Sequence, residues 1–155
     1  MGTKTKKSSK IRRMTAADIN IVKELARELF KDEWSQETWL TEINNNISYY
    51  SVLEINNEIV GYAGYWLVAG EAQIIRIAVA SKLQGRGLGN LLVSDMIERA
   101  MSQGALAVSL EVRESNIPAR KVYERNGFVE SGIRPNYYQD NNENAVIMWL
   151  KTEQG

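Results

Sequence analysis

The 155-residue sequence contains no cysteine and no histidine. Without cysteine the chain has no disulfide framework, no thiolate metal site and no cysteine nucleophile. Without histidine it has no Ser-His-Asp triad and no imidazole base, so any proton transfer must use Glu, Asp, Lys, Tyr, a chain terminus or water. We therefore expect no metal site and no covalent intermediate on a thiol.

Long apolar runs and an overall charge are also missing. No apolar run approaches 18 residues and no signal-peptide pattern opens the chain, so we expect a cytoplasmic protein that does not enter a membrane. The 19 basic and 19 acidic residues balance, but six of the basic ones lie within positions 1–13. We expect residues 1–10 to form a disordered basic tail. The remaining acidic body argues against direct nucleic-acid binding and suits a cationic substrate.

The apolar residues, 44% of the chain, are enough for one hydrophobic core, and we expect a single domain over residues 11–151. Their spacing predicts strands at 11–14, 49–55, 58–66, 72–79, 107–112, 128–134 and 144–151. It predicts helices at about 19–31, 36–43, 88–103 and 118–125. The third helix is expected to bury Leu91, Leu92, Met96, Ile97 and Ala100. This order predicts a mixed sheet with helices on both faces, in which the strand-helix-strand unit at 72–112 places two parallel strands side by side.

A glycine-rich turn follows the run richest in β-branched residues and opens directly onto a helix. Residues 75–92 read IRIAVASKLQGRGLGNLL. The glycines allow unusual backbone dihedrals and close approach of a ligand. The first N–H groups of the following helix have no partner within the helix, and its dipole favours an anion. This stretch predicts a site for a di- or triphosphate group.

Other readings of the glycine turn are less consistent with the sequence. A Walker loop needs Lys-Ser/Thr after its last glycine, and none follows here. The dinucleotide fingerprint Gly-x-Gly-x-x-Gly fits Gly85 and Gly87, with Glu111 near the expected acid, but Asn90 replaces its third glycine. The chain is also short for a dinucleotide domain plus a substrate domain. A simple helix-capping turn is the remaining alternative.

Five stretches together resemble a known family. Gln84 to Gly89 fits the pattern Gln/Arg-x-x-Gly-x-Gly/Ala. The other four are Trp34-Ser35, LEVR at 110–113, Asn116 through Tyr123-Glu124 to Gly127-Phe128, and RPNYY at 134–138. Over residues 11–150 the chain resembles the GNAT acetyltransferases, and within them the ribosomal-protein-alanine N-acetyltransferase (RimI-like) branch. The resemblance implies an α+β (mixed α/β) GNAT fold, with a mostly antiparallel mixed sheet of about seven strands and helices on both faces.

The resemblance also implies roles for individual residues. Glu111 matches the proton acceptor of the family and Tyr123 its proton donor. The residues that match contacts to acetyl-coenzyme A are Ile77, Ala78, Val79, Gln84, Gly85, Arg86, Gly87, Leu88, Gly89, Asn90 and Asn116. Trp34, Tyr137 and Tyr138 match aromatic residues beside the acceptor. We expect both tyrosines in the loop between the last two strands. Trp34 and Trp39 could instead pack in the core.

Acetyl transfer to an amine is consistent with the two catalytic assignments. An amine must lose a proton before it attacks a thioester, and a carboxylate can take that proton directly or through water. Alternation along strand 107–112 puts Val108 and Leu110 on one face and Ser109 and Glu111 on the other. A tyrosine with a pKa near 10 can protonate a thiolate whose conjugate acid has a pKa near 8.5. A partly exposed polar face and an ordinary core tyrosine are the structural alternatives.

The sequence therefore predicts an acetyl-coenzyme A-dependent N-acetyltransferase that works by direct transfer in a ternary complex. The predicted acceptor is the α-amine of a protein N-terminus, with a ribosomal protein as the first candidate. We expect a monomer or weak dimer with no membrane partner. Two alternatives remain open: an enzyme of the same fold that acts on a small amine or a lysine side chain, and a non-catalytic coenzyme A-binding protein.

Overall fold

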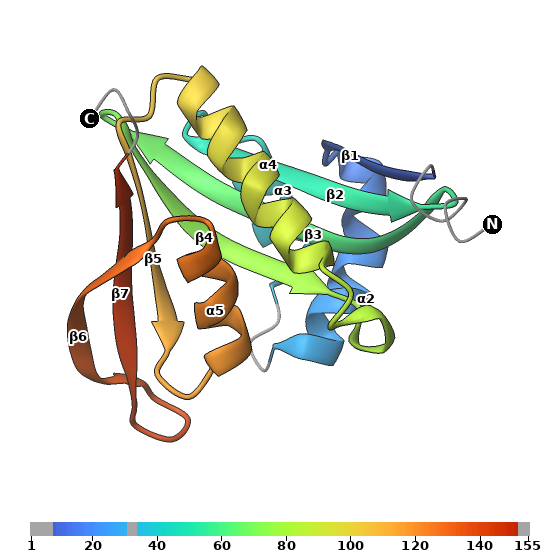
Figure 1. Cartoon of the computed structure of the whole chain (residues 1–155). Coiled ribbons are helices and arrows are strands. Elements are labelled where there is room, and N and C mark those ends of the chain that lie inside the picture. The colour runs from blue at the N-terminus through green and yellow to red at the C-terminus, as the bar shows by residue number, and fades with distance from the viewer. Residues whose placement is uncertain (1–7, 31–33, 152–155) are drawn as a thin grey trace.

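The computed structural model describes residues 8–30 and 34–151, and a seven-stranded sheet runs through them in the order β1-β2-β3-β4-β5-β7-β6. Helices α4 and α5 pack on one face of the sheet, and α2 and α3 pack on the other (Figure 1). The elements are β1 (Ser9–Arg13), η1 (Ala16–Asp18), α2 (Ile19–Leu29), α3 (Gln36–Ile43), β2 (Ser48–Ile55), β3 (Glu58–Val68), β4 (Glu71–Val79), η2 (Ser81–Leu83), α4 (Leu88–Ser102), β5 (Ala107–Arg113), α5 (Ile117–Arg125), β6 (Val129–Tyr138) and β7 (Glu143–Lys151).

The strand pairing confirms the expected mixed, mostly antiparallel sheet. β4 and β5 pair in parallel, and the other neighbouring strands pair antiparallel. β1 begins at Ser9, two residues before the predicted strand, so Ser9 and Lys10 of the predicted tail lie in the sheet. The tail residues 1–7 lie outside the described part of the chain.

A bulge in β4 divides its side chains between two cores. Gly64 of β3 pairs with Arg76, whereas Tyr65 pairs with Ile74, so Ile75 is an extra residue. Beyond the bulge, Ala78 packs in the cluster beneath α2 and α3. Val79 packs with the cluster beneath α4 and α5. The end of β4 is therefore anchored from both sides of the sheet.

Two further predictions from the sequence are wrong. Leu91 is 44% exposed, because the buried stripe of α4 follows the spacing of Leu92, Met96 and Ala100 and Leu91 lies beside that stripe. The second concerns Tyr137 and Tyr138, which lie within β6 and not in a loop. That strand continues past Arg134 because Tyr138 pairs with Glu143 of β7 and Asn136 N–H donates to the side chain of Asn144.

An ion pair fixes the first strand to the first helical turn. Both terminal nitrogens of Arg12 bind the carboxylate of Asp18, at 2.9 and 2.8 Å, and Thr15 N–H donates to the same carboxylate at 2.8 Å. Asp18 is 5% exposed. The hydrogen bonds from Arg12 hold the pKa of Asp18 below its usual value.

No helix within the described ranges is long and apolar enough to cross a membrane.

We expect Asp18→Asn to lower the free energy of unfolding at pH 7 by about 1–3 kcal/mol, because the neutral amide weakens the bonds from Arg12. The folded-state pKa of Asp18 is depressed below its unfolded value of about 3.9, so this stabilisation is present above about pH 4 and is lost as the pH falls through the folded pKa. Urea unfolding of both proteins should therefore show a difference that shrinks below about pH 4. A difference that grew on acidification would contradict this account.

Candidate active site

The parallel strands β4 and β5 separate after a short stretch of pairing. Only Glu71, Ala72 and Gln73 pair across to β5, at Ala107, Val108 and Ser109. Beyond them β4 keeps its pairing with β3, and β5 keeps its pairing with β7. The second halves of β4 and β5 therefore face each other across a gap in the sheet.

Backbone donors of β4 point into this gap. Ala80 N–H donates to Val60 of β3 at 2.8 Å. Alternate residues of a strand direct their N–H groups to opposite edges, so Val79 and Ile77 direct theirs away from β3. These donors are free to bind an extended ligand or a developing negative charge on an oxygen.

A groove of about 630 Å³ opens beside the end of β4, between the glycine turn and α5. Gly85 and Gly87 adopt φ values of +82° and +81°. A Cβ built at Gly85, Gly87 or Gly89 would meet no atom within 4 Å. The lining residues are Val79, Leu83, Gln84, Gly85, Gly87, Leu88, Gly89, Asn90, Asn116, Ile117, Pro118, Ala119, Lys121, Val122 and Arg125.

Side-chain hydrogen bonds fix the walls of the groove. Gln84 Nε2 donates to Val79 O at 3.1 Å and folds the turn back onto β4. Asn126 Nδ2 donates to Asn90 Oδ1 at 2.8 Å and connects α5 to α4. Asn116 caps α5 by accepting from Ala119 N–H at 3.3 Å. Gln84, Asn90 and Asn116 therefore each stabilise the groove that they line.

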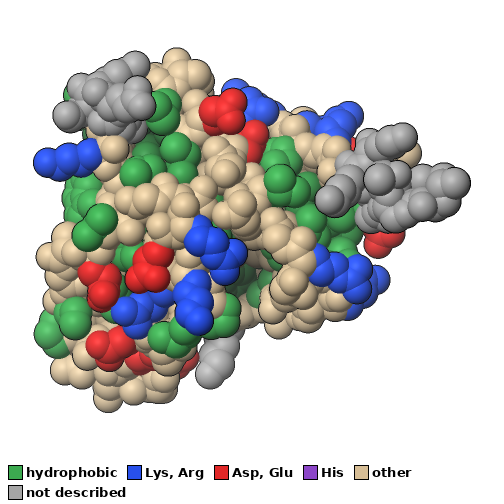
Figure 2. All heavy atoms as spheres, in the orientation of Figure 1, with side chains coloured by type: hydrophobic (Ala, Val, Ile, Leu, Met, Phe, Trp, Pro, Cys, Tyr) green, Lys and Arg blue, Asp and Glu red, His purple; other side chains and the backbone are tan. Residues whose placement is uncertain are grey.

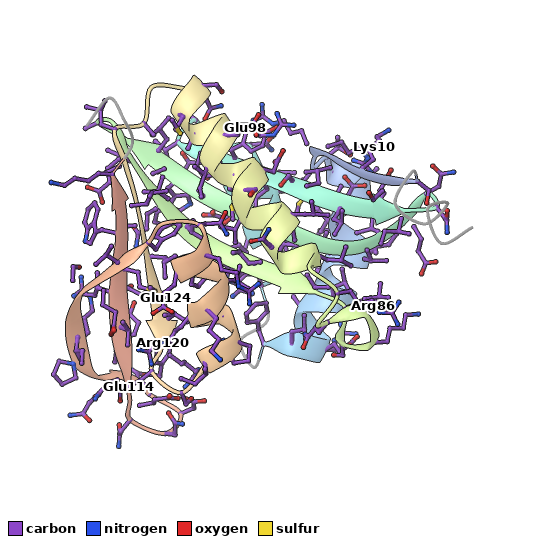
Figure 3. All side chains as sticks on the ribbon, in the orientation of Figure 1. Lys10, Arg86, Glu98, Glu114, Arg120 and Glu124 are labelled. Atoms are coloured by element: carbon purple, nitrogen blue, oxygen red, sulfur yellow. The ribbon has the colours of Figure 1, made fainter. Side chains whose placement is uncertain are left out.

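Positive charge gathers around the groove. Lys121 and Arg125 line it from α5, and Arg86 extends outward from the glycine turn (Figure 3). In the space-filling view, Lys and Arg side chains flank the hollow between α5 and the turn (Figure 2). Open backbone N–H groups at the start of α4, flanked by cations, are suited to a polyphosphate.

Glu111 lies on the face of β5 opposite the α4/α5 core, as the alternation predicted. Its side chain is 17% exposed and forms an ion pair with Arg134 of β6. Burial and a hydrogen bond to Glu111 raise the pKa of Tyr137. The guanidinium of Arg134 lies 6.0 Å from the centroid of the Tyr137 ring. Glu111, Arg134 and Tyr137 therefore form one polar group beside the gap.

Tyr123 lies on the other side of β5, packed against the α4/α5 core. Its ring centroid is 5.7 Å from that of Phe128. Burial, with a smaller effect of Tyr138, raises the pKa of Tyr123. The structure thus places Glu111 and Tyr123 on opposite sides of the strand that borders the gap.

An arginine that the sequence analysis did not single out holds the β6–β7 turn. Arg113 binds Asp140 at 3.1 Å and Glu143 at 3.3 Å, and its guanidinium lies 4.0 Å from the centroid of the Tyr138 ring. Ser115 N–H donates to Glu143 at 2.7 Å and, together with Arg113, lowers the pKa of Glu143 to about 2. Burial raises the pKa of Tyr138 to about 12. The only sequence signal was the position of Arg113 at the end of the LEVR stretch.

Trp34 and Trp39 differ in environment. Trp39 is fully buried, so the core alternative is correct for it. Trp34 is half-buried, with its ring centroid 4.7 Å from that of Trp39 and 4.3 Å from the guanidinium of Arg76. Arg76 also lies 4.5 Å from the centroid of Phe30. A buried arginine in the middle of the IRIAV strand was a signal that the sequence analysis missed.

The remaining predicted contacts divide between the groove and the gap. Leu88 lines the groove at the start of α4. Ala78 is 3% exposed and packs beneath α2 and α3, so only its backbone is available to a ligand. Within the described residues no group of acidic side chains is arranged to hold a metal ion.

Two separated parallel strands beside a glycine turn form a site suited to an extended ligand with a diphosphate group, and comparison with known proteins identifies the family. The model of the acetyltransferase (GNAT) family matches residues 19–128. The chain belongs to this family and is an acetyl-coenzyme A-dependent N-acetyltransferase. The family and fold expected from the sequence are thereby confirmed.

Its relatives point to one branch of the family. A Bacillus subtilis protein, provisionally named a [ribosomal protein bS18]-alanine N-acetyltransferase, is 37% identical over 146 residues, which are 94% of this chain and 97% of the relative. The Haemophilus influenzae enzyme of that name is 37% identical over 143 residues, 89% of this chain and 95% of its own. The crystal structure of the Escherichia coli ribosomal-protein-S18-alanine N-acetyltransferase superposes with a TM-score of 0.84 at 30% identity, covering 92% and 93% of the two chains.

We expect Gly87→Ala to weaken acetyl-coenzyme A binding by about tenfold to a hundredfold, because the methyl group keeps a phosphate from the turn N–H groups. The positive φ adds a folding cost of about 1–2 kcal/mol. Gly104 is the matched control: it has φ +95° and equally open surroundings at the other end of α4. Calorimetric titration should show loss of affinity for Gly87→Ala alone, while both variants lose thermal stability. Equal affinities in the two variants would contradict the assignment.

Proposed function

We propose that this enzyme transfers the acetyl group of acetyl-coenzyme A to the α-amine of a protein N-terminus, with a ribosomal protein as the first candidate. The relatives named for ribosomal protein bS18 match nearly the whole chain and support this acceptor. The observation that carries the proposal is a carboxylate, Glu111, beside the gap and on the face opposite the α4/α5 core. A cytoplasmic location belongs to the same proposal, because ribosomal proteins are made there.

Acetyl-coenzyme A would lie in the groove and reach the gap between β4 and β5. When bound, it supplies an activated thioester. The turn Gln84–Asn90 offers backbone N–H groups to the diphosphate, and Lys121, Arg125 and Arg86 offer positive charge. Asn116 lines the groove, and the N–H groups of Ile77 and Val79 face the gap. This arrangement fits a long, anionic and partly extended ligand.

The acceptor amine would approach from the Glu111 side. Glu111 takes a proton from the ammonium group, directly or through water, so that the neutral amine can attack. An α-amine with a pKa of about 8 is easier to deprotonate than a lysine side chain near 10.4. Tyr123, on the other side of β5, donates its hydroxyl proton toward the leaving sulfur. Trp34, Tyr137 and Tyr138 are proposed to flank the acceptor. Trp34 contacts Arg76 of β4, and the rings of Tyr137 and Tyr138 contact each other with centroids 5.1 Å apart.

The acceptor class is tested by free-thiol release from acetyl-coenzyme A with hexapeptides that differ in their first residue, alongside one polyamine. We expect turnover with peptides that begin with Ala or Ser, because a small first residue leaves the α-amine free to reach Glu111. Blocking the α-amine should abolish release. Turnover with the polyamine alone would replace the proposed acceptor by a small amine, and binding of coenzyme A without any product would favour the non-catalytic alternative.

The two catalytic roles are tested by Glu111→Gln and Tyr123→Phe with saturating peptide. We expect kcat to fall about a hundredfold or more for Glu111→Gln and about tenfold or more for Tyr123→Phe, since general acid-base groups contribute on this scale. Glu98→Gln, at an exposed position of α4, and Tyr49→Phe on β2 are matched controls that should retain wild-type kcat. Unchanged kcat in both site variants would refute the assigned mechanism.

A further inference from the structure

The carboxylate proposed as the base is already engaged by a cation of its own chain. Arg134 Nε forms an ion pair with Glu111 Oε2. Tyr137 hydrogen-bonds to the same carboxylate. An acceptor ammonium that approaches Glu111 must therefore meet Arg134 first.

The two partners of this ion pair differ in exposure and in how firmly their strands are paired. Glu111 is 17% exposed and lies in β5, which pairs with β7 along its whole length. Arg134 is 58% exposed and lies in β6, the edge strand, where regular pairing breaks between Arg134 and Tyr138. The arginine can therefore rotate into solvent while the carboxylate stays in place.

Arg113 is a neighbouring arginine of the same sheet that is held firmly, and it can be compared with Arg134. Arg113 and Arg134 both pair with Ala145 of β7, from opposite sides. Arg113 is held by two carboxylates and by the Tyr138 ring. Among the described residues Arg134 has one carboxylate partner, Glu111, and a longer 6.0 Å contact to Tyr137. Arg113 therefore stabilises the β6–β7 turn, whereas Arg134 contacts Glu111 and Tyr137 of the site.

We propose that Arg134 is a specificity-determining residue, which forms an ion pair with Glu111 in the free enzyme and is displaced by the ammonium group of the acceptor. This inference rests on the proposed function, because it requires an acceptor that arrives as a cation. The displacing ammonium then loses its proton to a Glu111 oxygen, while Arg134 keeps its charge throughout and exchanges no proton. An uncharged amine or a blocked N-terminus cannot displace the guanidinium, so Arg134 selects for a free, protonated α-amine.

Displacing Arg134 from Glu111 costs little free energy. A partly exposed ion pair favours the paired state over the separated state by a factor of only about two to five. Arg134→Gln removes the competitor, and we expect it to lower the Kd of an Ala-starting hexapeptide for the coenzyme A-bound enzyme by about that factor in calorimetric titration. The KM for peptide should fall in parallel, with the KM for acetyl-coenzyme A unchanged. Arg134→Lys keeps a cation at the site and should restore the wild-type Kd.

Two comparisons separate competition from a structural effect. The same hexapeptide with an acetylated N-terminus lacks the ammonium group, so its weaker binding should not respond to Arg134→Gln. Arg99→Gln breaks a similar single ion pair, with Asp95 on α4, and should leave the Kd of both peptides unchanged.

Unchanged or weaker binding of the free peptide to Arg134→Gln would overturn the proposed competition by Arg134, and so would an equal effect on both peptides. If no peptide bound to wild type or variants although coenzyme A did, the proposed peptide acceptor itself would fail.

Discussion

The separation of β4 from β5 is the constraint on which the rest of this molecule depends. Three residue pairs hold the strands together, and past Gln73 and Ser109 each strand keeps only its outer neighbour. Interrupting a sheet exposes backbone N–H and C=O groups that would otherwise pair, and this costs free energy unless water or a ligand binds them. The gap therefore provides an extended row of donors and acceptors for a ligand at the centre of the domain.

Packing on both faces keeps the gap open. On one face α4 and α5 share a core with β3, β4 and β5. On the other face Trp39 of α3 forms edge-to-face contacts with Tyr50 and Tyr62, with centroids 5.4 and 5.5 Å apart. Tyr50 lies flat over Gly64, where any side chain would overlap its ring. Since β4 is fixed from both faces, it cannot move toward β5 to close the gap without disrupting a core.

Features encoded within a few residues were predictable from the sequence. Asn56 and Asn57 take the positive φ values, 52° and 66°, that a tight hairpin turn requires. Pro118 lies in the first turn of α5 and Gly127 has φ +96° just beyond its end, so local signals set both ends of that helix. The glycine turn was recognised for the same reason. The roles of Glu111 and Tyr123 were inferred through family resemblance and stay predictions.

Features that depend on distant partners were not predictable in this way. The β4 bulge at Ile75 appears only once β3 is paired beside it. Arg113 contacts Asp140 across 27 positions of sequence, and this contact gives the Asn-rich turn its place beside the site. Arg134 reaches Glu111 across β7, so its ion pair depends on a strand order that no local pattern encodes. The extension of β6 through Tyr138 likewise required the side chain of Asn144.

The environment of Tyr123 changes how its proposed role must be understood. A thiol with a pKa near 8.5 is already a stronger acid than a free tyrosine near 10, so proton transfer from tyrosine to a fully formed thiolate is unfavourable by about 2 kcal/mol. Burial raises the pKa of Tyr123 further and increases that cost. A tyrosine in this position therefore acts best while the carbon-sulfur bond is breaking, by a hydrogen bond that strengthens as negative charge grows on sulfur. A tyrosine is protonated at neutral pH in any case, and the raised pKa means that a tyrosinate formed at Tyr123 readily takes up a proton from water before the next catalytic cycle.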